Sequence, residues 1–238
     1  MRKKDDVPSS VSVESPIRKD SRTLMYLLLA VSGGAMDAHS YLNRGHVFAN
    51  AQTGNLLLLG VSISDMDMRS TVHYLFPILA FVLGIALADL LLYILAERFR
   101  TGEKTVLLLE TLIMLSIAYI PQDCNSLANA LTSFACGMQL EAFREFDGSA
   151  VPTTMCIGNL RCATSFFIKY LQMRDRSFLA KSALYTIVIA VFVCGAIIEG
   201  KLIKLAGNMS ILFSAAIMFV CLLISAAEDR RDDSGGIS

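Results

Sequence analysis

The sequence predicts an all-α integral membrane protein, and its composition and charge distribution carry that prediction. Apolar residues make up 54% of the 238 residues and charged residues only 18%, below the ~25% of an average soluble domain. The charges gather at the two ends of the chain and in short clusters between long apolar runs. Net charge is zero, so no basic surface for nucleic acid is present. Disulfide scaffolds, coiled coils and disordered chains are excluded.

Eight apolar segments follow one another, and about six are expected to be transmembrane helices, since a crossing needs roughly 20 apolar residues. Two segments, 47–63 and 152–171, open with polar, helix-poor residues, and a helical run of only about ten to twelve residues, about 15–18 Å long, follows. We expect these two to be broken or re-entrant helices. The eight segments are 24–42, 47–63, 71–96, 105–121, 125–143, 152–171, 178–199 and 205–227.

The chain also repeats itself weakly at an offset of 103 to 104 residues, which predicts two related halves. We expect a first membrane half at 23–121 and a second at 122–227. Disordered polar tails are expected at 1–22 and 228–238. The matched positions are Gly34 with Gly137, Asp37 with Glu141, and Gly54-Asn55 with Gly158-Asn159.

Basic residues indicate the orientation of the chain. If segments two and six re-enter, more Lys and Arg residues lie on the side of the N-terminus than if all eight segments cross, and cytoplasmic loops are rich in these residues. We therefore expect a multi-pass protein of the cytoplasmic (inner or plasma) membrane of a bacterium, with its N-terminus in the cytoplasm. Three crossings per half make the repeat inverted. Eight crossings with parallel halves are the alternative.

Asp37 is the most informative residue, because it lies well inside the first apolar segment. A carboxylate there costs about 2.5–3.5 kcal/mol on insertion scales, which a partner, protonation or a water-filled cavity must offset. Thr53, Gly54 and Asn55 then open a helix whose free N–H groups would point into the membrane and need a partner. These residues predict either a substrate or ion path or a structural site that satisfies a helix break.

The second half offers a matching set, with the same two interpretations. Glu141 is either the repeat partner of Asp37 or an interfacial acid balanced by Arg144. Gly158 and Asn159 correspond to the first helix opening. Arg161 could hold an anionic substrate group or neutralise Asp37.

Two other acids, Glu110 and Glu199, are expected to lie near water at the ends of their apolar segments. Glu110 lies near the start of its apolar segment and is expected to reach the interface. Glu199 stands beside Lys201 and is expected to form a solvated ion pair.

Enzyme signatures are missing from the sequence, which has no H-E-x-x-H, P-loop or G-x-S-x-G motif. None of the six cysteines belongs to a C-x-x-C pair, and the three histidines are spread along the chain. We therefore expect no enzyme activity, no catalytic residue, no metal site and no cofactor.

The stretch 34–60 resembles the YoaK/DUF1275 family of small polytopic bacterial membrane proteins. Length and segment order extend the resemblance over about 24–227, and Ile157 departs from it where Thr53 stands in the first half. It implies a polytopic protein often described as a small-molecule transporter, with no catalytic residues to carry over. The residues that carry it are Gly34, Asp37, Ala38, Tyr41, Leu42, Gly45, Phe48, Thr53, Gly54, Asn55 and Gly60.

The function that these features favour is a secondary transporter or facilitator of a small solute. No nucleotide motif is present, so an ion or proton gradient would supply the energy. A non-transporting membrane scaffold or sensor is the alternative, and a passive channel lies between the two. The expected partners are the lipid bilayer and a small-molecule or ion substrate. Nucleic acid is not expected, and small residues on several helices permit a homo-oligomer.

Overall fold

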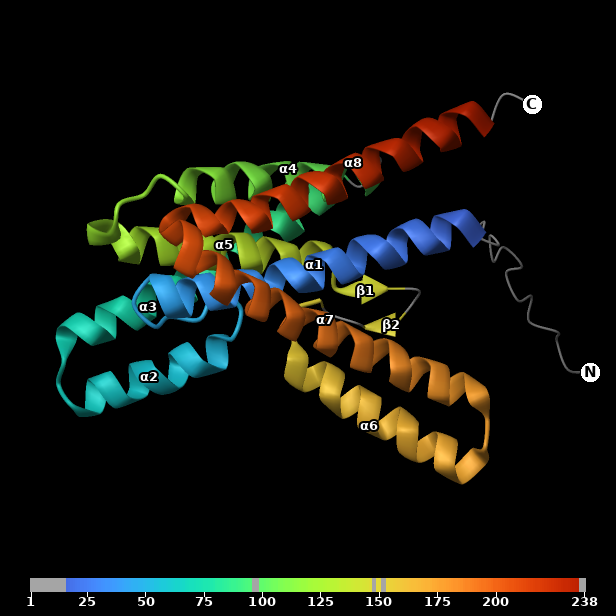
Figure 1. Cartoon of the computed structure of the whole chain (residues 1–238), viewed down its shortest axis with the longest axis horizontal. Helices are drawn as coiled ribbons and strands as arrows, with labels where there is room; N and C mark the ends of the chain where they lie inside the picture. Colours follow the sequence, from blue (N-terminus) through green and yellow to red (C-terminus); the bar gives the residue numbers. More distant parts are fainter. Residues whose placement is uncertain (1–15, 96–98, 147–148, 151–152, 236–238) are drawn as a thin grey trace, which may run out of the picture.

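The computed structural model describes residues 16–95, 99–146, 149–150 and 153–235, which are almost entirely helical (Figure 1). The first half contains α1 (Pro16–Asn43), α2 (Gln52–Ser64), α3 (Met68–Ile94) and α4 (Phe99–Ile117). The second half contains α5 (Asn125–Ala142), α6 (Cys156–Met173), α7 (Arg176–Ala206) and α8 (Leu212–Gly235). The short elements are the 3₁₀ turns η2 (Gln122–Cys124) and η3 (Gly207–Ile211) and the strands β1 (Glu145–Phe146) and β2 (Ser149–Ala150).

The helices extend further at both ends of the chain than the sequence predicts. α1 begins at Pro16 and α8 continues to Gly235, so the prediction of disorder is wrong for 16–22 and 228–235. Proline is favoured at the first helical position, and the Glu and Arg residues near the C-terminus are good helix formers. The rest of both tails, 1–15 and 236–238, lies outside the described residues.

The two segments expected to be broken helices differ from each other. α2 has 13 residues, about 20 Å at 1.5 Å per residue, as the polar opening of its segment predicts. α6 has 18 residues and is longer than expected, because it continues to Met173. The connection before α6 also contains β1 and β2, which pair antiparallel and which the all-α prediction omitted.

Among the residues that the structure describes, two helical stretches are long and apolar enough to cross a membrane. They are Met68–Ile94, with a mean hydropathy of 2.5, and Arg176–Glu228, with a mean hydropathy of 2.4. Only 17% of the apolar window in Met68–Ile94 is buried inside the protein. A water-soluble core helix would bury its apolar side chains, so this outward apolar surface is typical of a helix that faces lipid.

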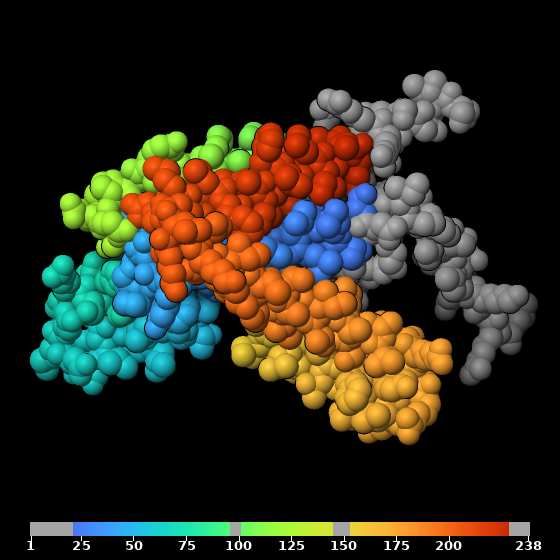
Figure 2. Space-filling model, viewed as in Figure 1, coloured from blue at the N-terminus to red at the C-terminus, as the bar shows by residue number. Residues whose placement is uncertain are grey.

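The helices of the two halves are exchanged between two bundles. α1 packs along α7 together with α6 and α8, and we call these four helices bundle A. α5 packs along α3 together with α2 and α4, and we call these bundle B. The bundles meet mainly where α4 packs against α8. In Figure 2, α2 and α3 form a lobe on the left, and α6 with the start of α7 forms a lobe at the lower right.

Glycines bring α1 and α7 into backbone contact. A Cβ atom on Gly34 would overlap the carbonyl oxygen of Phe192, and one on Gly195 would overlap the carbonyl oxygen of Val31. Each helix therefore presents a glycine to the backbone of the other. Such close approach is how small residues hold helices together in a membrane, where no hydrophobic force drives them together.

The same contacts recur between α5 and α3. A Cβ atom on Gly137 would overlap the carbonyl oxygen of Phe81, and one on Gly84 would overlap that of Phe134. α1 maps onto α5 with an offset of 103 residues, and α3 maps onto α7 with an offset of 111. The weak repeat in the sequence thus corresponds to a repeated three-dimensional contact.

The turns that precede α3 and α7 are also alike. Met66 and Arg174 both have a positive φ, 55° and 56°, and an aspartate cap follows in each turn. Asp67 accepts hydrogen bonds from Ser70 and Asp175 accepts one from the backbone of Ser177, and these bonds hold the pKa of each carboxyl below its usual value. The α2–α3 and α6–α7 hairpins are therefore built in the same way.

Corresponding helices of the two halves run in opposite directions. In Figure 1, α1 runs from right to left, whereas α5 runs from left to right. α2 and α6 both begin near the middle of the molecule and run toward opposite ends. The start of α1 and the end of α8 both lie on the right.

We expect Gly34→Ala to lower the free energy of unfolding by about 1–3 kcal/mol, since α1 and α7 must move apart to admit the methyl group. Gly60→Ala is the matched control on α2, where a Cβ atom meets nothing within 4 Å. It should be neutral or stabilising by up to ~1 kcal/mol, because alanine favours helix. Denaturant unfolding in detergent micelles measures both. Equal effects of the two variants would show that the glycine contact does not hold the crossing.

Candidate functional site

Two non-helical connections return from the ends of the molecule toward its middle. Residues 44–51 lead from the end of α1 back to the start of α2, and residues 143–155 lead from the end of α5 back to the start of α6 (Figure 1). We call these connections loop 1 and loop 2. Neither α2 nor α6 has a side-chain hydrogen bond from its N-cap residue, Ala51 or Met155.

Loop 1 is bound to α1 through Asn50. Its backbone N–H donates to Asp37 Oδ1 at 2.7 Å, and its side-chain Nδ2 donates to the carbonyl oxygen of Gly33 at 3.1 Å. The Asp37 carboxylate also faces the backbone N–H groups of Ala49 and Ala51. Asp37 thus satisfies backbone donors just before α2, where a helix start leaves them without intrahelical partners.

Loop 2 reaches the same part of α1. Gln139 of α5 donates from Nε2 to the carbonyl oxygen of Leu29 and to Thr153 Oγ1, both at 3.1 Å. The neighbouring Thr154 lies against α1, where a Cβ atom on Gly33 would be 2.7 Å from its Cγ2. Asn50 and Thr154 therefore approach Gly33 from the two loops, and the absence of a side chain there leaves room for both.

Asn55 stabilises the conformation of loop 1 through hydrogen bonds to its backbone. It is fully buried, accepts from the backbone N–H of Phe48 at 3.0 Å, and donates from Nδ2 to the Phe48 carbonyl oxygen at 2.7 Å. The same Nδ2 also donates to Gln52 Oε1 at 2.8 Å. The side-chain amide of Asn55 therefore pairs with both backbone groups of Phe48, as a neighbouring β-strand would. This is the role expected if the motif is a structural site that satisfies a helix break.

The other motif residues at the starts of α2 and α6 differ in their exposure to solvent. Thr53 is exposed, and Gly54 lies beneath the ring of Phe48, where a Cβ atom would be 2.7 Å from Cδ2. In the second half Gly158 is exposed with open space around it, and Asn159 is buried. The two asparagines are thus the buried members of the motif in both halves.

Arg161 and Glu141 do not join Asp37. Arg161 is exposed on α6, and it does not form an ion pair with Asp37. Glu141 pairs with Arg144 at 2.9 Å, the interfacial pair that its alternative interpretation predicts. The 103-residue offset places Leu140, not Glu141, opposite Asp37, because the sequence match shifted by one residue after Gly137.

Two acids differ from their predicted surroundings. Glu199 is fully buried rather than paired with Lys201 in solvent, and its Oε1 lies 3.0 Å from Nδ1 of His39. Ser210 Oγ lies 3.1 Å from the same nitrogen. Glu110 is also fully buried and does not reach the interface. His39 and Glu199 are 160 residues apart, so no spacing in the sequence signals their contact.

A second polar cluster joins the bundles at the left end of the molecule. Arg44, which is 1% exposed, donates to the carbonyl oxygen of Ile117 at 3.0 Å and to that of Pro121 at 3.3 Å. It also donates to Asn125 Oδ1 at 3.2 Å, and Asn129 donates to its carbonyl oxygen at 2.7 Å. The cation thus binds carbonyl groups at the C-terminal end of α4, where the helix dipole is negative.

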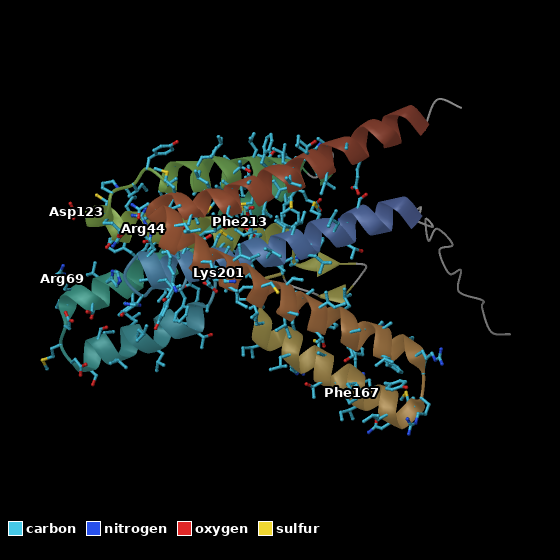
Figure 3. All side chains as sticks on the ribbon, viewed as in Figure 1. Arg44, Arg69, Asp123, Phe167, Lys201 and Phe213 are labelled. Carbon is cyan, nitrogen blue, oxygen red and sulfur yellow. The ribbon has the colours of Figure 1, made fainter. Side chains whose placement is uncertain are left out.

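A cleft of ≈ 880 Å³ lies at the same end, between the start of α3 and the α4–α5 connection. Figure 3 shows Arg69 and Asp123 at this end, with Arg44 behind them. The cleft does not include the meeting point of the two loops on α1. Its lining residues are Met68, Arg69, Ser70, Val72, His73, Gln122, Asp123, Asn125 and Ser126.

Comparison with known proteins bears out the predicted family. The model of the DUF1275 family, described as a protein of unknown function, matches residues 25–224. The chain is 25% identical over 189 residues to the UPF0700 transmembrane protein YoaK of Bacillus subtilis (strain 168). The match covers 74% of this chain and 82% of that protein. No solved structure matches the chain.

We expect Asn55→Ala to lower the free energy of unfolding by about 2–4 kcal/mol, since it leaves the N–H and C=O of Phe48 without partners. Thr53→Ala, two residues away on an exposed position, should change it by about 0.5 kcal/mol or less. Denaturant unfolding of both variants in the same detergent makes the comparison. If Asn55→Ala lowered the free energy of unfolding only slightly, water would be replacing the amide as the partner of Phe48, and loop 1 would be accessible to water.

Proposed function

The chain belongs to the DUF1275 family, and we propose that this transmembrane protein is a secondary transporter or facilitator of a small solute in the cytoplasmic membrane of a bacterium. The observation that carries the proposal is the meeting of loops 1 and 2 on α1, at Gly33. Non-helical backbone at membrane depth is tolerated where protein covers it or where it lines a cavity, and many transporters bind their substrates at such breaks.

We further propose six membrane crossings by α1, α3, α4, α5, α7 and α8, with the α2 and α6 segments re-entrant, and an inverted relation between the halves. The opposite directions of α1 and α5, the shared side of the start of α1 and the end of α8, and the repeated glycine contacts support this arrangement. The distribution of Lys and Arg then places the end with both termini in the cytoplasm.

Bundles A and B are the two bodies that would move against each other in alternating access. At the outer end, the Arg44 cluster joins α1 of bundle A to the α4–α5 connection of bundle B. At the inner end, Arg22 of α1 lies 3.5 Å from Glu103 of α4. Polar contacts thus join the bundles at both ends, and opening toward either side would require one of these contacts to break while the other holds.

Asp37 is the residue of the predicted path best placed to take part, because it is partly exposed and lies where loop 1 joins α1. Asn55, Gly54 and the second-half Gly158 and Asn159 would shape the loops around it. We do not place Glu141 or Arg161 in the path, since one pairs with Arg144 and the other is exposed on α6.

A non-transporting scaffold or sensor is the second candidate, and one observation favours it. The polar groups of loop 1 are bound to the chain itself, with Asp37 and Asn55 both holding backbone groups. In that case the motif would serve folding alone, and no solute would stabilise the protein. A passive channel would instead give flux that does not depend on an ion gradient.

Met68→Cys and Met173→Cys test the inverted arrangement. These methionines are 71% and 63% exposed and lie at the equivalent α2–α3 and α6–α7 turns. In a variant without native cysteines, an impermeant maleimide should label Cys at position 68 in intact cells and Cys at position 173 only after lysis. Labelling of both positions from the same side would contradict the inverted repeat and the six-crossing topology.

Asp37→Asn tests the solute path. Its amide oxygen can still accept from Asn50, so we expect the variant to fold and reach the membrane. In a thermal-shift screen against amino acids, sugars, nucleosides and organic acids, a solute at 100 times its Kd should stabilise the wild type by about 2.7 kcal/mol. The variant should lose most of that gain, and Glu141→Gln should keep it.

Equal stabilisation of wild type and Asp37→Asn would remove Asp37 from the solute site. Failure of every solute to stabilise the wild type would favour the scaffold or sensor.

A further inference from the structure

Glu110 of α4 is the acid whose surroundings the predicted path does not explain. Its side chain is fully buried, and within the described part of the chain neither carboxylate oxygen has a hydrogen-bond partner. By contrast, Asp37 holds the backbone of loop 1 and Glu199 contacts His39. An ionised carboxylate without a partner is strongly disfavoured in such a site, so Glu110 must carry a proton in the closed structure.

The walls around Glu110 are apolar. Val106, Leu107 and Met114 lie three or four residues away on the same face of α4 and are fully buried. Met218 of α8 belongs to the same buried cluster as Met114. Glu110 therefore lies in the surface where bundle A packs against bundle B.

The titratable groups within electrostatic range of Glu110 on neighbouring helices include two thiols. Cys136 of α5 and Cys221 of α8 are both buried and both within electrostatic range of its carboxylate. Cys136 is also within electrostatic range of Asp37. On α3 the acid Asp89 is exposed, and η3 carries no charged residue. Elsewhere on α4, Glu103 forms an ion pair with Arg22 of α1.

We propose that Glu110 is a proton-binding site that couples the opening of the α4–α8 contact to proton transfer, which rests on the proposed transporter function. With the bundles closed, the carboxylic acid holds its proton. When α4 and α8 separate, water enters, the O–H bond breaks, the proton passes to water and the hydrated carboxylate remains. Closing against the apolar walls then requires a proton from the newly open side.

The protonation state is tested by infrared spectroscopy of the full-length chain in lipid bilayers at neutral pH. The difference between wild type and Glu110→Gln should contain the C=O stretch of a protonated carboxylic acid. Glu141→Gln, the surface control, should not remove that band. If Glu110→Gln removed carboxylate bands from the spectrum and left the acid band, the proposal would be overturned. It would also be overturned if adding sodium at constant pH converted the acid band into carboxylate bands.

The coupling is tested by the distance between spin labels at Leu115 of α4 and Phe219 of α8, which are 41% and 50% exposed. The cysteines that are not buried, Cys124, Cys156, Cys162 and Cys194, are replaced by alanine first. Raising the pH should lengthen the distance in the wild type. Glu110→Gln copies the protonated acid and should stay closed at every pH.

A wild-type distance that does not change with pH, or an equal change in Glu110→Gln, would contradict the coupling. Neither measurement needs the solute. The proton site therefore stands or fails on these data, while the thermal-shift screen with Asp37→Asn decides the transporter function separately.

Discussion

Backbone groups that leave a helix inside an apolar protein must find partners within the chain, because lipid offers none. Loops 1 and 2 each meet this requirement with a few side chains. Asp37 and Asn55 bind the backbone of loop 1, Asn50 binds α1, and Gln139 ties loop 2 to α1. The meeting point of the loops, and hence the candidate site, exists only because these bonds hold the non-helical chain in place.

Two glycine crossings provide the frame around that meeting point. They place α1 in bundle A and α5 in bundle B, so each half of the chain contributes a helix to the other half's bundle. Loops 1 and 2 each join a helix of one bundle to a helix of the other, so any motion of the bundles relative to each other must move both loops. The polar contacts at the two ends, around Arg44 and between Arg22 and Glu103, lie where such motion would open the molecule.

Asp37, Glu199 and Glu110 have different surroundings. Asp37 is partly exposed and accepts a hydrogen bond from the backbone of loop 1. Glu199 Oε1 lies 3.0 Å from Nδ1 of His39. Glu110 has neither a donor nor a cation and is neutral while the bundles are closed. The proposed transporter would use the first of these acids where the loops meet and the last at the contact between the bundles.

The sequence by itself determined the helical membrane class, the family and the polar starts of the helices that contain Asn55 and Asn159. Apolar length, polar interruptions and a register of glycines are local properties that the order of residues displays directly. Only the tertiary structure decided which groups meet. Glu199 lies beside His39 rather than Lys201, Glu110 is buried rather than interfacial, and Glu141 is not the partner of Asp37. Those outcomes depend on which helix faces pack together across 100 or more residues of chain, and hydropathy does not encode that choice.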